Sequence, residues 1–465
     1  MELKKKIHLL WRASFGPNIS DFQQVQRLTI AQLWNTIKDD AKKPLAPLLP
    51  TSTLVQDNYG KTADNTMTKV QREEWNRSIR QQSAKDLREL NALWIDNMVG
   101  SSNQLAERMS FFWHNHFAIR QNNSFLQNEA INIIRKHAIG SFRDLLREVS
   151  KSGAMILSLN NQQNRKQSPN ENFAREIMEL FSMGIGAYTE QDIKEAARAF
   201  TGWTIDRDGY FTFRRNYHDS DTKTFLGKTG KFDGDDIIDI LLNHPQTATF
   251  IVTKVYRYFV SEQIDANRIN RLAQGFRKDY DILTLLDNIF QSDGFYDSKH
   301  IGARIKTPVE LIVGARRLSP IQDLQDNLQY SIQKLLGQIL FYPPSIAGWP
   351  SDTNWIDNST LLVRLQFPYI MNGTRQNNFK AKSDDDVNMG MRDNQNENPI
   401  RNATARRNPL WTDWANKLSI DQLIQSMLVK DPSHKNINTM VSKLNNKEAQ
   451  QTAYAIMGLP EYQLC

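Results

Sequence analysis

Two histidines, His114 and His116, lie two residues apart in the aromatic segment 111–117. An imidazole can bind a metal ion or move a proton near neutral pH. On a regular helix, residues two apart differ by about 200° of rotation, so both rings face one metal only if the helix ends between them. The polar segment 121–124 that follows indicates a nearby helix end. We therefore predict His116 as a metal ligand, with His114 in a catalytic, supporting role. In the alternative, one histidine lies in the aromatic core and the other caps the helix C-terminus.

A second set of candidates lies in segment 168–181. Ser168 and Glu171 have the spacing of a capping box, with Pro169 at the first helical position. Beyond them, one face of the predicted helix is an apolar stripe of Phe173, Ile177 and Leu180. The opposite face is polar and carries Asn172, Arg175, Glu176 and Glu179. Such a face is commonly solvated, with an Arg175–Glu179 ion pair. Turned into a cleft, it would instead present Glu176 as a ligand or general base, with Glu171 beside it.

The third candidate pair, His218 and Asp219, follows a predicted β-hairpin. Asp208-Gly209 lies between two strand-prone runs in segment 203–213, which is a strong hairpin signal. An adjacent imidazole and carboxylate can bind a hard or borderline metal. The alternative is a turn held by its own local hydrogen bonds.

Tryptophans on glycine-containing loops are candidates for binding rather than catalysis. Trp203 and Trp349 each follow a glycine, and Trp355 is close to the second. Aromatic side chains on loops can stack on sugars or bases, but in an aromatic-rich chain they more often fill a core.

The elements that must position these residues are predominantly helical. Segment 69–99 carries apolar side chains at helical spacing, at Trp75, Ile79, Leu87, Leu90, Trp94 and Met98. Several later segments repeat this pattern. We predict a mainly α fold, a large multi-helix globular domain with one small β-hairpin near 203–216. Residues 1–373 would form the main domain, 374–409 an Asn-rich flexible insertion, and 410–465 helices (418–428 and 447–457) that close the same domain.

Composition restricts the classes of function. The 465 residues carry a net charge of +7, a mild excess that does not indicate nucleic-acid binding. The single cysteine, Cys465, rules out an internal disulfide or a zinc ribbon. No apolar run is long enough to span a membrane, and the N-terminal residues do not have the pattern of a secretion signal. The default expectation is a cytoplasmic protein, with export left open.

An ordered series of motifs is similar to a known bacterial family. The motifs lie at 8–13, 15–17, 112–117, 170–186, 196–203, 218–219, 223–227, 233–245, 306–310, 337–338, 343–349 and 459–464. Together they resemble the domain-of-unknown-function 1800 (DUF1800) family over nearly the whole chain. The resemblance implies a mainly helical bacterial protein of no established activity. It also implies a partner, because members are often encoded beside a second uncharacterised family, DUF1501.

Two hypotheses for the function follow. In the first, the protein is a metal-dependent hydrolase with a site in a helical cleft, in which a divalent metal ion activates water. Its metal ligands are His116, His218, Asp219 and Glu176, and its catalytic or supporting residues are Glu171, Glu176 and His114. In the second, the protein is a non-enzymatic scaffold or binding protein. The same polar residues then form a buried hydrogen-bond network that joins helices, and the tryptophan loops contact a protein or glycan partner.

Overall fold

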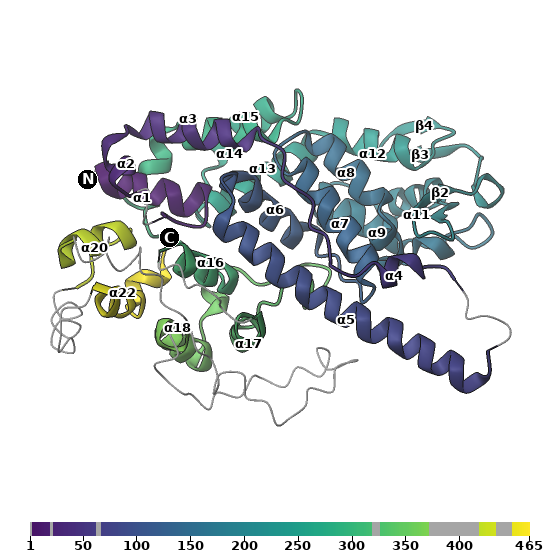
Figure 1. The fold of residues 1–465 in the computed structure, drawn as a ribbon. Coiled ribbons are helices and arrows are strands. Elements are labelled where there is room, and N and C mark those ends of the chain that lie inside the picture. Colours follow the sequence, from purple (N-terminus) through teal and green to yellow (C-terminus); the bar gives the residue numbers. More distant parts are fainter. Residues whose placement is uncertain (1, 19–21, 62–66, 319–325, 372–417, 434–448) are drawn as a thin grey trace.

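The computed structural model describes residues 2–18, 22–61, 67–318, 326–371, 418–433 and 449–465. The described chain is mainly helical, with two small two-stranded antiparallel sheets (Figure 1). This confirms the predicted fold class. In these ranges no helix has both the length and the apolar character needed to cross a bilayer.

Nine α-helices lie in the described part of the first third of the chain. They are α1 (Glu2–Ala13), α2 (Phe22–Arg27), α3 (Ile30–Ala41), α4 (Leu54–Asp57), α5 (Lys69–Gly100), α6 (Gln104–Phe117), α7 (Ser124–His137), α8 (Phe142–Lys151) and α9 (Gly153–Ser158). Side-chain caps define where several of them begin. Thr29 and Thr68 form capping boxes at α3 and α5, and the Asn103 and Asn123 side chains accept backbone N–H groups at α6 and α7.

The middle of the chain contains the predicted acidic helix and both sheets. Its elements are the 3-10 turn η2 (Asn161–Gln163), α10 (Asn172–Glu176), the π-helical turn η3 (Ile177–Ser182), α11 (Glu190–Ala199), β1 (Trp203–Ile205), β2 (Phe211–Phe213), the 3-10 turn η4 (Arg215–Tyr217), β3 (Lys223–Phe225) and β4 (Lys228–Gly230). The predicted hairpin is confirmed as β1–β2, with Trp203 opposite Phe213. The β3–β4 hairpin was not predicted. It turns at Leu226 and Gly227, which both have positive φ angles, 47° and 75°.

The predicted capping box at Ser168 is wrong. Helix α10 begins only at Asn172, and Glu171 at its N-cap makes no side-chain cap. Ser168 instead forms a β-bridge with Arg165, and the Asn170 side chain accepts the Asn172 N–H at 2.9 Å. An asparagine two residues upstream therefore replaces the predicted cap.

The rest of the described chain is again mainly helical. It contains α12 (Gly234–Asn243), α13 (Pro245–Phe259), α14 (Ala266–Phe276), α15 (Ile282–Phe290), η5 (Asp293–Tyr296), α16 (Pro308–Leu318), α17 (Asp326–Leu336), η6 (Asp352–Trp355), α18 (Asn358–Met371), α20 (Ile420–Met427), α22 (Ala449–Met457) and η7 (Pro460–Gln463). The predicted closing helices correspond to α20 and α22. Helix α20 contacts α1 and α22, and α22 also contacts α18. The predicted insertion 374–409 lies outside the described residues.

Helices α5 and α6 organise the interior. Helix α5 runs diagonally below α6 and α7 and contacts both of them and also α16 and α17 (Figure 1). Its buried residues begin at Ser83, so the N-terminal part of the helix extends beyond the body of the protein. Every residue of α6 except Asn115 is buried. The segment with the two histidines is therefore the end of a core helix.

Candidate functional site

His116 links three elements through both of its ring nitrogens. Its Nε2 lies 3.1 Å from the Phe181 carbonyl oxygen, which only accepts hydrogen bonds, so Nε2 carries the proton. Its Nδ1 then accepts from the Lys254 ammonium at 3.2 Å. Burial, together with the Lys254 charge, lowers the pKa of His116 well below its usual value. The ring is therefore neutral and fully hydrogen-bonded.

The partner of His116 is the π-helical turn Ile177–Ser182. The last carbonyls of a helix lack partners within the helix and must find them elsewhere. Lys254 from α13 donates to Leu180 O at 3.1 Å, and His116 from α6 donates to Phe181 O. Burial lowers the pKa of Lys254 to about 8. These two side chains thus cap the end of η3 from neighbouring helices.

The three residues before His116 also link α6 to distant segments. Trp113 Nε1 donates to Ala138 O at 2.9 Å, and His114 Nε2 accepts the Phe341 N–H at 3.1 Å. Asn115 Oδ1 accepts the Trp349 N–H at 2.8 Å. Burial lowers the pKa of His114 to about 3, so this ring is neutral too. We call residues 113–116 the α6 hub, because each of its side chains holds a different part of the chain.

The tryptophans predicted to lie on loops fill the core, and two of them lie in elements, Trp203 in β1 and Trp355 in η6. Trp203, Trp349 and Trp355 are 2%, 6% and 4% exposed. The Trp349 ring packs on His114 with 5.2 Å between the ring centroids. This arrangement agrees with the core alternative rather than with stacking on a ligand.

Arg175 of α10 is the centre of an ion-pair network that includes the candidate Glu171 but not the candidate Glu176. Arg175 contacts Glu171 at 3.1 Å, Glu179 at 3.4 Å and Glu190 at 2.8 Å, which confirms the predicted Arg175–Glu179 pair. Glu176 lies at the edge of this network and is 9% exposed. Burial and the neighbouring Glu179 raise its pKa, and Arg175 opposes the shift.

His218 and Asp219 form a locally bonded turn beside α11. The Nδ1 atom of His218 donates to Thr201 O at 3.0 Å. Asp219 receives two hydrogen bonds from Arg198, at 2.7 and 3.3 Å. Burial alone would raise the pKa of Asp219, but the Arg198 hydrogen bonds and charge outweigh it and the pKa is lowered.

The predicted ligands are not assembled into a metal centre in this geometry. Across the described ranges, no group of three or more His, Cys, Asp or Glu side chains could hold a metal ion. His116 is hydrogen-bonded to η3 and α13. His218 and Asp219 are instead hydrogen-bonded to Thr201 and Arg198, at the C-terminal end of α11. The metal site stays a prediction that the geometry does not support.

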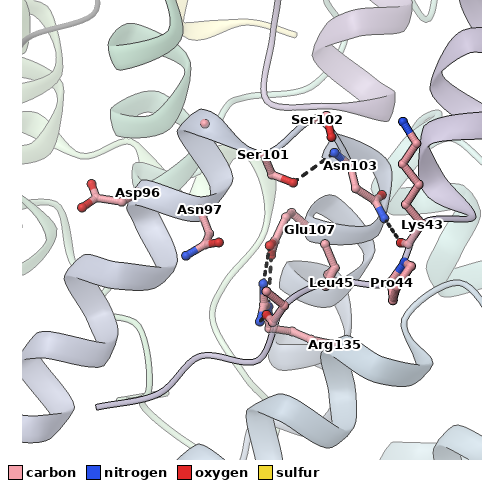
Figure 2. Close-up of a pocket in the computed structure, with 12 residues that line it drawn as sticks. Lys43, Pro44, Leu45, Asp96, Asn97, Ser101, Ser102, Asn103, Glu107 and Arg135 are labelled. Atoms are coloured by element: carbon pink, nitrogen blue, oxygen red, sulfur yellow. Dashed lines mark hydrogen bonds and ion pairs between the residues drawn. The ribbon is translucent and has the colours of Figure 1, made fainter. Parts of the chain in front are cut away.

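Among the described residues, two pockets with room for a ligand stand out, and the larger of these two is lined mainly by polar residues. This polar pocket of about 520 Å³ lies between segment 43–46, the end of α5, the start of α6 and Arg135 of α7 (Figure 2). Glu107 and Arg135 face each other on its wall and form a buried ion pair at 2.5 Å. Lys43 pairs with Asp40, and Asp96 pairs with Arg316. Each charged side chain of this pocket thus already has an oppositely charged partner in the protein.

The smaller pocket, of about 350 Å³, has an aromatic wall. It lies between the turn after α4 and the tip of the β1–β2 hairpin, and we call it the aromatic pocket. The rings of Tyr59, Phe125 and Tyr210 follow one another along it, with centroid distances of 5.4 and 5.7 Å. Tyr210 is 45% exposed. The polar side chains around these rings are those of Gln56, Asp57, Lys61, Arg207 and Asp208.

Two glycines bring the walls of the aromatic pocket together. A Cβ atom on Gly60 would lie 1.8 Å from the Arg207 carbonyl oxygen. A Cβ atom on Gly209 would lie 2.7 Å from Cε1 of Tyr59, and Gly209 also has a φ angle of +89°. Both positions therefore require glycine, because the hairpin tip packs directly on the α4 turn.

A partly buried carboxyl lies near the hairpin tip. Burial raises the pKa of Glu129 on α7 to about 7, a hydrogen bond from the Gly153 backbone opposes this, and Asp206 adds to it. The Asp206 side chain accepts the N–H groups of Asp208 and Tyr210. The raised pKa means that a larger fraction of Glu129 is protonated than for an ordinary glutamate, which limits charge repulsion close to this turn.

Sequence patterns identified only part of the aromatic pocket. The Asp208-Gly209 turn that precedes Tyr210 was visible as a hairpin signal. Tyr59 and Phe125 lie on other elements, and no spacing rule connects them to the hairpin. The one local signal was Tyr59-Gly60, an aromatic residue before a glycine in a polar segment.

Residues 8–464 match the model of a protein family, which is described as "Protein of unknown function (DUF1800)". The chain belongs to the DUF1800 family. This confirms the resemblance seen in the ordered motifs, and the family match includes both the α6 hub and the aromatic pocket. No curated protein and no solved structure matches the chain.

Proposed function

We propose that this DUF1800 protein is a glycan-binding protein and that the aromatic pocket takes a sugar residue. The observation that carries the proposal is the row of three rings, Tyr59, Phe125 and Tyr210, along a pocket of about 350 Å³. This volume lies within the range typical of small-molecule sites.

The composition of the aromatic pocket fits a sugar better than a purely apolar ligand. A sugar ring has C–H groups on its faces and hydroxyl groups around its edge. The electron-rich face of a tyrosine or phenylalanine attracts the C–H groups. The Gln56 amide, the Asp208 carboxylate and the Arg207 guanidinium can exchange hydrogen bonds with the hydroxyl groups.

The roles of the histidines favour binding over hydrolysis. His114 and His116 are neutral and joined to Phe341, Phe181 and Lys254, which is the buried network that the binding hypothesis expects. The metal-dependent hydrolase, with its divalent ion, stays an untested alternative. A partner protein of the DUF1501 family would be compatible with either activity.

Replacing Tyr210 by alanine tests the proposal. Isothermal titration of the intact chain with soluble hexasaccharides of glucose, xylose, mannose and N-acetylglucosamine is expected to detect binding of at least one. In Tyr210→Ala, loss of the exposed ring is expected to weaken that binding at least about tenfold, about 1.4 kcal/mol. Trp75→Ala, on the part of α5 that extends from the body, is the control and is expected to bind as the wild type does. Equal affinity of Tyr210→Ala and wild type, or no binding of any hexasaccharide, would refute the proposal.

Gly209→Ala tests whether the pocket depends on the glycine contacts. The added Cβ must displace the Tyr59 ring, because it would lie 2.7 Å from Cε1. We expect sugar affinity to fall as far as in Tyr210→Ala. Gly186→Ala is a matched control, because Gly186 also has a positive φ angle of 106° but a Cβ there meets no atom within 4 Å. Both variants carry backbone strain of about 1–3 kcal/mol, visible as a lower Tm, and only Gly209→Ala should lose the sugar. Equal affinities in the two variants would contradict this role.

A further inference from the structure

Three motifs that the proposed function leaves unused meet in the interior. They are the α1 motif with Trp11 and Arg12, the motif 306–310 with Arg304 just before it, and the final motif 459–464. The Lys306 ammonium lies 3.5 Å from the centroid of the Trp11 ring and 3.7 Å from that of Tyr462, and it donates to Tyr462 O. Arg108 of α6 and Arg364 of α18 complete the group, which we call the buried basic cluster.

The buried basic cluster contains more positive than negative charge through its four arginines, whereas burial lowers the pKa of Lys306 to about 7. Its five basic residues are at most 6% exposed, namely Arg12, Arg108, Arg304, Lys306 and Arg364. Glu310, which is 1% exposed, contacts both Arg108 and Arg304 at 2.6 Å. It also accepts hydrogen bonds from Tyr258 Oη at 3.2 Å and Thr307 N at 2.8 Å. Three of these four groups contact the same oxygen, Oε1, and only Thr307 N contacts Oε2. A negative charge at Cys465 offsets part of the remaining positive charge.

Arg12 is the least compensated member. Its Nη2 makes one long hydrogen bond, 3.4 Å, to His300 O. Its Nε and Nη1 atoms, and the Nε atom of Arg108, are buried and have no hydrogen-bond partner among the described residues. Burial, together with the charges of Arg304 and Arg108, lowers the pKa of Arg12 to about 10, against the attraction of Cys465 and Glu310. A buried guanidinium with unused donors is costly unless a negative group compensates it.

We propose that the buried basic cluster binds a small inorganic anion of chloride size between Arg12 and Arg108. The unused N–H groups of two guanidiniums supply its hydrogen bonds, and the excess positive charge supplies its electrostatic attraction. Arg12 and Arg108 are at most 1% exposed, which favours a small monatomic ion over the larger phosphate or a carboxylate ligand. The role is structural, because the anion joins α1 to α6 in the core.

Anion-dependent stability tests the proposal on the intact chain. Protein dialysed free of halide is unfolded by heat in sodium chloride and in sodium gluconate at equal concentrations. A ligand that binds only the folded state raises Tm as its concentration passes the dissociation constant. We expect Tm to rise in chloride relative to gluconate and then to level off. Equal Tm values in both salts would overturn the proposal.

Two variants locate the effect. Arg12→Met removes the guanidinium but keeps a side chain of similar length, and exchange of a buried charge for an apolar group is often tolerated. It is expected to lose the difference between chloride and gluconate. Arg198→Met, which breaks a paired arginine outside the cluster, is expected to keep it. A difference that persists in Arg12→Met would overturn the site.

Crystallography with bromide gives a readout that does not depend on the variants. Crystals soaked in sodium bromide are expected to show an anomalous peak within hydrogen-bond distance of Arg12 and Arg108. Absence of bromide there, with ordered water against the same N–H groups, would refute the anion and assign the donors to solvent.

Discussion

Replacing His116 by alanine is expected to lower the free energy of unfolding by about 3 kcal/mol. The variant leaves Phe181 O without its donor and Lys254 without one acceptor, both in the interior. It also opens a cavity among Phe112, Trp113 and Phe181, whose rings surround the imidazole. The measurement is urea unfolding followed by circular dichroism.

His218→Ala is the matched control for His116→Ala. His218 is half-buried on a loop and has one strong backbone hydrogen bond, so its loss should cost less than about 1 kcal/mol. Elemental analysis of the same proteins separates the structural role from metal binding. Similar stability losses in the two variants, or a stoichiometric metal that disappears with His116, would contradict the role of the α6 hub.

Replacing Glu310 by glutamine is expected to destabilise the protein by about 3–5 kcal/mol. Arg108 and Arg304 then lie in the interior without the carboxylate that both contact at 2.6 Å. Glutamine keeps the size of the side chain, so the loss reports charge rather than packing. Glu190→Gln, at an exposed pair with Arg175, is the control and should leave the unfolding curve nearly unchanged.

The pH dependence of stability distinguishes the loss of the Glu310 charge from destabilisation by the other acidic groups of the protein. Burial alone would raise the pKa of Glu310, but Arg108 and Arg304 lower it from 4.5 to about 2 in the folded protein. A carboxyl with a lowered folded pKa stabilises the protein above its unfolded pKa, and this contribution disappears as the pH falls through the folded pKa. The wild type should lose about 3 kcal/mol between pH 4.5 and 2 from this group. Glu310→Gln should lose less over the same range, and an unchanged acid slope would contradict the assignment.

Local sequence signals predicted the elements better than the contacts between them. The Asp208-Gly209 pair predicted β1–β2, because a tight hairpin turn needs residues that tolerate positive φ angles. The end of α6 after Phe117 was predicted from the polar residues that follow. The Ser168 cap was wrong because its spacing rule ignores the competing bridge to Arg165. The β3–β4 turn at Leu226 was missed because leucine seldom adopts a positive φ.

The candidate site depended on information that local patterns do not contain. His114 and His116 were identified as important by residue type, and the helical geometry correctly indicated different partners for them. Those partners, Phe341 and Phe181, are 227 and 65 residues away in the chain. No periodicity relates such positions. For the same reason the aromatic pocket, built from Tyr59, Phe125 and Tyr210, could not be assembled from the sequence.

The contacts of the α6 hub also determine when the chain can complete its folding during synthesis. Helix α6 is complete once residue 117 has been made, but the backbone groups that His114 and Asn115 hold are synthesised 227 and 234 residues later. Until then, His114 and Asn115 of the nascent chain lack the backbone N–H groups that they accept in the folded protein. The first two-thirds of this chain therefore cannot reach its final packing until segment 341–349 has emerged from the ribosome.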